Sequence, residues 1–236
     1  MHAYRRILLL KIPYCSFPGT TKKNIDYRTQ QSFRPIPSLA LATLSSFIDK
    51  YKSYDYRLSV VDINIEAYTE PSKSIDTSFY VNLLYGRIKN VEYDVLAISA
   101  MFVFNYRWVD MAVKLSRRFQ PGAKIILGGG YATLFPERCL REHEIDNVVI
   151  GEGEATFLHI LNRYNSHYDR EFEGKFPFDG YASRSECGTV QFCRKESFLN
   201  LDDLAPPAWH YFNLEKYFRN SGDRVLPIEG SRGLSI

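Results

Sequence analysis

The feature that most constrains this chain is an alternation of short apolar runs with helical patterns between residues 93 and 164. Three runs have the character of buried strands, and each ends in small residues: residues 94–100, 124–127 and 147–150. Between the first two, apolar residues recur at helical spacing until Pro121-Gly122 ends the pattern. Continuous apolar strands that alternate with helices indicate a parallel sheet covered on both faces. The stretch therefore predicts an α/β fold.

Two further strands are expected before this stretch. Residues 7–12 form an apolar run that Pro13 stops, and residues 57–62 are expected to form the second strand. Ser38 is a plausible N-cap for a buried helix over residues 39–48, and a second helix is expected around residues 79–88. The expected sheet thus has five strands. The polar residues 14–37 between the first strand and the first helix predict either a functional loop or a mobile one.

The pattern changes after residue 167. Residues 179–184 and 189–194 predict a β-hairpin with Gly188 at its turn, and Pro206-Pro207 indicates an extended linker. A short helix is expected at residues 213–218, and Val225 begins what we interpret as another strand. We therefore expect one domain over residues 1–167, followed by a hairpin, a linker and the start of a second domain over residues 168–236.

Composition excludes several classes of function. Of the 236 residues, 45% are hydrophobic and 24% are charged, and these values are typical of a globular protein. The net charge of +3 is too small to indicate a nucleic-acid binder. Lys11 and Pro13 end the first apolar run far short of the roughly 18 residues that span a bilayer, so we expect no membrane partner and a cytoplasmic location. The four cysteines and five histidines show no metal-ligand spacing, and no catalytic or metal-binding residue is assigned.

Three features could contact a ligand, and each has a simpler interpretation. The triplet Gly128-Gly129-Gly130 exposes bare backbone after a strand, but it would also suit a tight turn. The Ser99 hydroxyl could face a ligand or bond to nearby backbone. Glu152 and Glu154 are better explained by the electrostatics of a helix N-terminus than by acid/base catalysis.

The order of these segments is more informative than any one of them. The chain resembles the N-terminal cobalamin-binding domain of cobalamin-dependent radical S-adenosylmethionine enzymes. The resemblance is carried by residues 34–41, 60–64, 94–99, 127–133 with Pro136-Glu137, and 149–157, and residues 227–233 resemble the lead-in to that family's iron–sulfur domain.

This resemblance implies a flavodoxin-like (Rossmann-like) parallel five-stranded sheet with helices on both faces, plus the C-terminal hairpin and linker. The cobalamin nucleotide tail would lie in a groove beside the central strand, and the corrin would lie across the strand carboxyl ends. Ser99 would contact the tail, the glycine triplet would line its path, and residues 151–154 would border the corrin. The residues assigned to the cofactor are Asp62, Asn64, Ser99, Ala100, Gly128, Gly129, Gly130, Tyr131, Gly151, Glu152, Gly153 and Glu154.

The chain departs from related cobalamin domains in its expected cobalt ligand. Where methionine-synthase-like domains carry an Asp-x-His-x-x-Gly motif, this sequence has Asp62-Ile63-Asn64-Ile65-Glu66-Ala67. An Asn64 amide is a poor donor to cobalt in place of an imidazole. Radical enzymes of this family generally lack the histidine too, so we expect base-off cobalamin with no protein histidine ligand. Tyr131 stands where the family often has histidine.

A second departure concerns activity. The sequence contains no CxxxCxxC motif, and Leu234 occupies the place expected for its first cysteine. We therefore expect the 4Fe-4S cluster and S-adenosylmethionine only in a full-length enzyme, with the radical domain supplied in cis or in trans. The chain is either a fragment or a naturally short relative. Alone it should be inactive, and the intact enzyme would be a methyltransferase.

Two alternatives remain open from the residues. The same fold could hold flavin mononucleotide, for which residues 16–21 are a loose phosphate-loop match. It could also be a cofactor-free regulatory or interaction module that recognises a partner through exposed aromatic side chains, because aromatic residues make up 15% of the chain.

Overall fold

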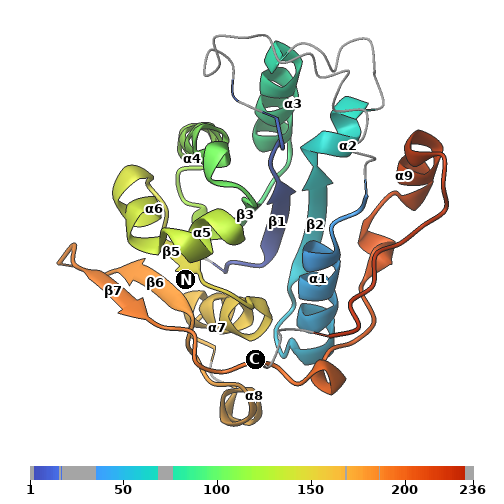
Figure 1. Ribbon diagram of the computed structural model, residues 1–236. Coiled ribbons are helices and arrows are strands. Elements are labelled where there is room, and N and C mark those ends of the chain that lie inside the picture. Colours follow the sequence, from blue (N-terminus) through green and yellow to red (C-terminus); the bar gives the residue numbers. More distant parts are fainter. Residues whose placement is uncertain are drawn as a thin grey trace.

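The computed structural model describes residues 3–15, 17, 36–68, 77–167, 169–185 and 187–231, and its core is a mixed seven-stranded sheet. The strand order is β2-β1-β3-β4-β5-β6-β7 (Figure 1). Its five parallel strands are β1 (Arg6–Lys11), β2 (Arg57–Asp62), β3 (Val95–Ser99), β4 (Lys124–Gly128) and β5 (Asn147–Val149). The five parallel runs are thus strands, and the α/β class is confirmed.

The sheet has seven strands and is mixed, whereas a parallel sheet of five strands was expected with the hairpin outside it. The hairpin of β6 (Tyr181–Arg184) and β7 (Val190–Cys193) continues the same sheet in the antiparallel sense, with Val148 of β5 opposite Ala182 of β6. An unpaired edge on β5 would expose a row of backbone donors and acceptors, and the hairpin satisfies that row. Ala182 is fully buried as a result. The division expected after residue 167 stays a prediction.

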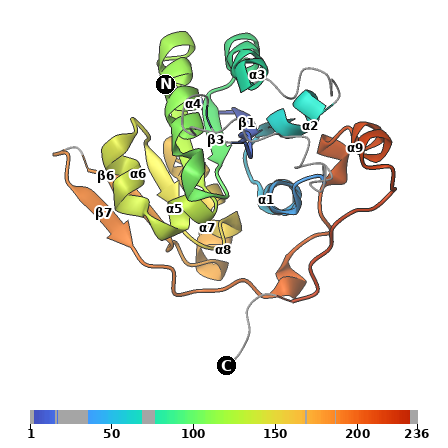
Figure 2. The same cartoon turned by 45° about the horizontal axis from the view of Figure 1, so that its top comes forward.

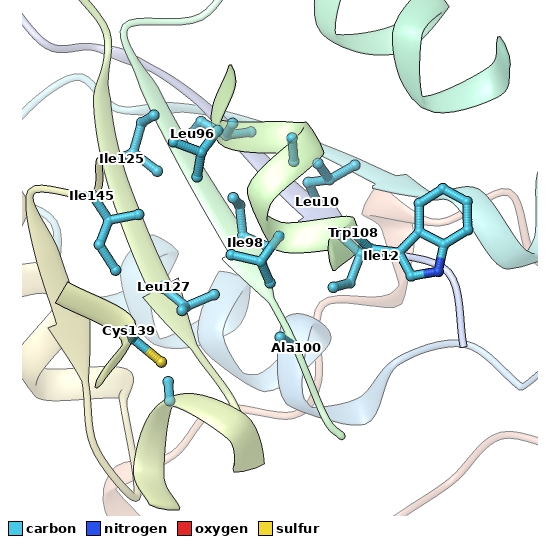
Figure 3. Packing of buried hydrophobic residues seen from close by; sticks show 14 of the residues in the cluster. Leu10, Ile12, Leu96, Ile98, Ala100, Trp108, Ile125, Leu127, Cys139 and Ile145 are labelled. Atoms are coloured by element: carbon cyan, nitrogen blue, oxygen red, sulfur yellow. The ribbon is translucent and has the colours of Figure 1, made fainter. Parts of the chain in front are cut away.

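Side chains alternate between two cores because successive residues of a strand point to opposite faces. On β3, Leu96 and Ile98 belong to one core, whereas Val95 and Ala97 belong to the other. The Leu96 side also holds the fully buried Trp108, and Figure 3 shows its packing. Helices α3 (Thr77–Asn90), α4 (Tyr106–Phe119), α5 (Gly130–Leu134) and α6 (Pro136–Glu142) cover this face.

The opposite face is covered by helices from both ends of the chain. They are α1 (Leu39–Tyr51), α7 (Glu154–Tyr164), α8 (Arg170–Lys175) and α9 (Leu214–Ser221). The predicted N-cap is confirmed, since the Ser38 hydroxyl accepts from the Leu41 N–H at 3.4 Å. The short α2 (Ile63–Tyr68) follows β2 directly and contributes to both cores.

The segment expected as an extended linker instead packs along α1. It contains two 3-10 turns, η3 (Leu201–Asp203) and η4 (Trp209–Tyr211), and the Ala208 N–H donates to the Ala42 carbonyl at 3.0 Å. The segment leads to α9, which lies beside α2 in both views (Figures 1 and 2). The strand expected from Val225 is not seen in the described residues 222–231, which form neither strand nor helix.

Within the described ranges, every helix is too short or too polar to cross a bilayer.

Candidate functional site

The strand order places a switch point between β1 and β3. Strand β1 leads to α1 on one face of the sheet, and β3 leads through η2 (Val103–Asn105) to α4 on the other. In open α/β sheets, ligands bind outside the carboxyl ends of the strands where two connections diverge in this way. Lys11 and Ser99 are register partners at this point. The crevice expected from the fold class would therefore lie beyond Lys11 and Ser99, and the carboxyl ends of β1 and β2 point toward the top of Figure 1.

Small residues mark one side of the switch point. Ser99 and its register partner Gly128 continue the alternation that puts Ala97 and Ile126 in the core beneath α1 and α7. Both are half-buried, whereas Ala97 below them is only 6% exposed. A Cβ added to Gly128 would lie 4.0 Å from the Val149 Cβ, which is an ordinary contact. The two residues thus share one face and leave space on it.

Gly129 and Gly130 have a different environment from Gly128. A Cβ on Gly129 would lie 2.6 Å from the Ala100 carbonyl oxygen, and one on Gly130 would lie 2.5 Å from that of Met101. The Tyr131 N–H also donates to the Ala100 carbonyl at 3.1 Å. These glycines therefore let the β4–α5 turn lie against the end of β3. Their predicted role along the tail is untested, and their missing side chains already serve this contact within the protein.

The Tyr131 side chain is fully buried in the core beneath α4 and α6. Burial raises the pKa of its phenol, and its ring packs near the rings of Phe135 and His143. Any contact of Tyr131 with a cofactor would have to use its main chain.

The buried Asp62 and the half-buried Asn64 form a polar network at the carboxyl end of β2. Asn64 donates from Nδ2 to the Ile12 carbonyl at 3.0 Å, and its Oδ1 accepts from the Tyr14 N–H at 2.8 Å. It also donates from its backbone and side chain to Asp62 Oδ1, at 2.9 Å in each case. The amide of Asn64 thus joins the ends of β1 and β2.

Asp62 also holds two groups that the sequence did not single out. Lys11 Nζ lies 3.0 Å from Asp62 Oδ2, and the Tyr217 hydroxyl donates to the same oxygen at 3.0 Å. Burial acts to lower the pKa of Lys11, but the Asp62 carboxylate and Tyr14 more than offset it, so that pKa is raised. Lys11 is therefore a buried ammonium at the switch point. Its only sequence signal was a charge at the end of an apolar strand.

The Gly-Glu-Gly-Glu segment after β5 lies farther along the same edge. Gly151 has φ +70°, and its N–H donates to the Thr133 hydroxyl at 3.0 Å. Glu152 accepts from the Leu199 N–H at 3.2 Å, and Glu154 is buried at the start of α7. A Cβ on Gly153 would lie 2.9 Å from Val149 Cγ1, so this glycine also serves packing.

An exposed apolar group follows β3 and was not assigned from the sequence. It consists of Met101, Phe102, Val103 and Phe104, which are 55%, 37%, 38% and 47% exposed. The Phe102 and Phe104 rings are stacked with centroids 5.0 Å apart, and Tyr14 from the end of β1 lies edge-on to Phe102 at 5.7 Å. The run of four apolar residues after a strand was the available signal.

The described histidines lie away from the switch point. His159 bonds to the Phe176 carbonyl, His167 to the Ser53 hydroxyl, and His210 lies 3.7 Å from Asp49. His143 is buried beside a surface pocket of about 490 Å³ between α4 and α6. Among the described residues, no group of three or more His, Cys, Asp or Glu side chains could hold a metal ion.

Residues 58–161 match the family model of the B12 binding domain. This match includes β2 through most of α7 and hence the glycine triplet, Ser99 and the segment after β5. Over this stretch the sequence is therefore similar to the B12 binding domain, and the chain resembles cobalamin-dependent radical S-adenosylmethionine methyltransferases.

One curated methyltransferase is similar in sequence, and two solved structures share the fold. The chain is 25% identical over 274 residues to cytidylyl-2-hydroxyethylphosphonate methyltransferase of Streptomyces wedmorensis, covering 98% of this chain and 46% of that protein. The cobalamin-dependent S-adenosylmethionine radical enzyme OxsB with aqua-cobalamin bound shares the fold, with TM-score 0.60 and 15% identity over 92% of this chain and 25% of that one. The radical S-adenosylmethionine methyltransferase TsrM from Kitasatospora setae gives TM-score 0.51 and 15% identity, over 80% of this chain and 31% of that one. The chain thus spans less than half the length of these proteins.

Proposed function

We propose that this chain binds cobalamin at the β1/β3 switch point and serves as the cofactor-binding part of a radical S-adenosylmethionine methyltransferase. The observation that carries the proposal is the pairing of Ser99 with Gly128 on one face of the sheet. These small residues lie at the strand carboxyl ends within the segment that matches the B12 binding domain. The nucleotide tail would lie over Ser99 and Gly128, and the corrin would lie toward the ends of β3 to β5.

The residues near the switch point suit a corrinoid in chemical character. A corrin ring offers broad apolar faces with polar amides at its rim. Met101 to Phe104 supply exposed apolar surface, while the turns after β4 and β5 supply backbone polar groups. Ala100 and Tyr131 would contribute through main chain, and Asp62 and Asn64 would hold the crevice in shape from behind.

The proposed cofactor state is base-off with no histidine from this chain on cobalt. The amide of Asn64, the residue in the expected ligand position, donates to the Ile12 carbonyl and accepts from the Tyr14 N–H. The four described histidines bond elsewhere or line the pocket between α4 and α6.

In the intact enzyme, the corrinoid would carry a methyl group to a substrate. The 4Fe-4S cluster and S-adenosylmethionine would be held by a radical domain in cis or in trans, because this sequence has no CxxxCxxC motif. The methyltransferase relative that matches nearly the whole chain supports this role.

The test is direct binding. The purified chain is incubated separately with hydroxocobalamin and with flavin mononucleotide, desalted, and examined by visible absorption. The proposal requires retention of the corrinoid near one per chain and loss of the flavin. Retention of flavin alone would favour the flavodoxin-type alternative, and a folded protein that retains neither would favour a cofactor-free interaction module.

A further inference from the structure

The Lys11 ammonium is where several distant segments meet. Its Nζ pairs with Asp62 at the end of β2 and donates to the Ile36 carbonyl just before α1, at 3.4 Å. It also lies 4.8 Å from the centroid of the Tyr14 ring, beyond the end of β1. Tyr14 and Ile36 flank the connection between β1 and α1. One buried cation therefore contacts both flanks of that connection, directly at the switch point.

The C-terminal segment reaches this cation through one hydroxyl. Tyr217 of α9 is 3% exposed, and its hydroxyl donates to the Asp62 oxygen that also pairs with Lys11. Tyr217 and Asp62 are 155 positions apart in the sequence. Burial and the adjacent Asp62 carboxylate raise the pKa of Tyr217, so its hydroxyl remains a donor.

Removal of that donor would take one hydrogen bond from the Asp62 carboxylate. A buried carboxylate needs its hydrogen bonds satisfied, and a lost donor leaves its remaining partners to rearrange. Asp62 Oδ1 is already held by Asn64, so the adjustable partner is Oδ2 with Lys11. A shift of Lys11 would be transmitted to Tyr14 and Ile36.

We propose that Tyr217 is a positioning residue of the cofactor crevice, acting through Asp62 and Lys11 to fix both flanks of the β1–α1 connection. This inference rests on the proposed cobalamin site. It assigns to α9, which lies outside the segment that matches the B12 binding domain, a part in shaping that site.

The experiment compares Tyr217→Phe with Tyr211→Phe. Tyr211 lies in η4 of the same C-terminal segment and donates its hydroxyl to Asp49 Oδ1 at 3.1 Å, on the outer side of α1. Each variant thus loses one tyrosine hydroxyl that bonds to a carboxylate. Hydroxocobalamin affinity is measured by absorption titration, and backbone hydrogen exchange is measured by mass spectrometry on the cofactor-free proteins.

Tyr217→Phe should weaken cobalamin binding about tenfold, the scale of one lost hydrogen bond to a charged group. In the cofactor-free protein it should accelerate exchange in peptides around residues 12–15 and 36–41, leaving β4 and β5 unchanged. Tyr211→Phe should leave the affinity and these peptides as in the parent chain.

The hydrogen-exchange measurement separates the proposed role of Tyr217 from the proposed cobalamin binding. If the parent chain binds no cobalamin, the proposed function fails, while the local exchange pattern still reports whether Tyr217 fixes the flanks. Equal affinities and equal exchange in the two variants would overturn the inference. Uniformly faster exchange across the sheet of Tyr217→Phe would also overturn it, because that pattern reports general destabilisation.

Discussion

Gly129 lies against the carbonyl of Ala100 so closely that a Cβ on Gly129 would be 2.6 Å from that oxygen. Its backbone angles, φ 97° and ψ −174°, fall in a region that only glycine adopts readily. The pair fixes how the β4–α5 turn meets the end of β3. It also means that a large side chain at Gly129 would disturb folding before it could report on a ligand.

Gly129→Ala should therefore lower the free energy of unfolding by about 3 kcal/mol, since backbone strain and a steric overlap act together. Urea unfolding followed by circular dichroism measures the loss. Gly122→Ala is the matched control, because a Cβ there meets nothing within 4 Å. Equal stability of the two variants would show that the turn relaxes at little cost.

Gly128 offers a cleaner probe of the proposed tail position. An added Cβ would make only an ordinary 4.0 Å contact with Val149, so Gly128→Ala should fold and bind cobalamin nearly as the parent chain does. Gly128→Leu should extend over the face shared with Ser99 and weaken cobalamin binding at least tenfold. Affinity is measured by absorption titration, with circular dichroism to confirm folding. A folded Gly128→Leu chain of parental affinity would place the tail elsewhere.

The central strands β1 and β3 were predictable because burial on both faces leaves a nearly unbroken apolar run. Residues 57–62 were predicted with the bounds that β2 has, and the hairpin was predicted from Gly188 and its flanking strands. The pairing of that hairpin with β5 was not predicted, because strand pairing depends on contacts between residues distant in sequence. The small helices α5 and α6 were also missed, since each has fewer than eight residues and little periodicity.

The candidate site was predictable only in part. The places of Ser99 and Gly128 at strand ends were predicted, because small residues that follow an apolar run are visible in sequence. The Tyr217–Asp62 contact joins positions 155 residues apart, and nothing local to either residue signals the other. Likewise, Tyr131 follows a glycine turn, yet only the packing of α5 shows that its ring lies in the core.

The cobalt coordination expected here has a spectroscopic signature. If no histidine of this chain binds cobalt, the cob(II)alamin form bound to the protein should show the electron paramagnetic resonance spectrum of a base-off species without nitrogen splitting. Free cob(II)alamin at neutral pH and in acid supplies the base-on and base-off references. Nitrogen splitting that persists would mean that an imidazole or the benzimidazole base remains on the metal, contrary to the proposed base-off state.

Asp179 should make stability depend on acid pH. Burial acts to raise the pKa of this carboxyl, but Lys195 at 2.9 Å and the N–H groups of Ser197 and Glu196 outweigh burial and lower the pKa to about 2. The unfolded value is near 3.8, so the folded state favours the carboxylate. Its contribution, about 2 kcal/mol, is complete above pH 4 and is lost as the pH falls toward 2.

Asp179→Asn should accordingly be less stable than the parent chain at neutral pH, and the difference should narrow between pH 4 and pH 2. Urea unfolding at a series of pH values measures it. Asp55→Asn serves as the control, because its carboxylate is exposed and lies 3.6 Å from Arg57. A difference for Asp179→Asn that stays constant from neutral pH to pH 2 would show that the Asp179 contacts do not favour its charged form.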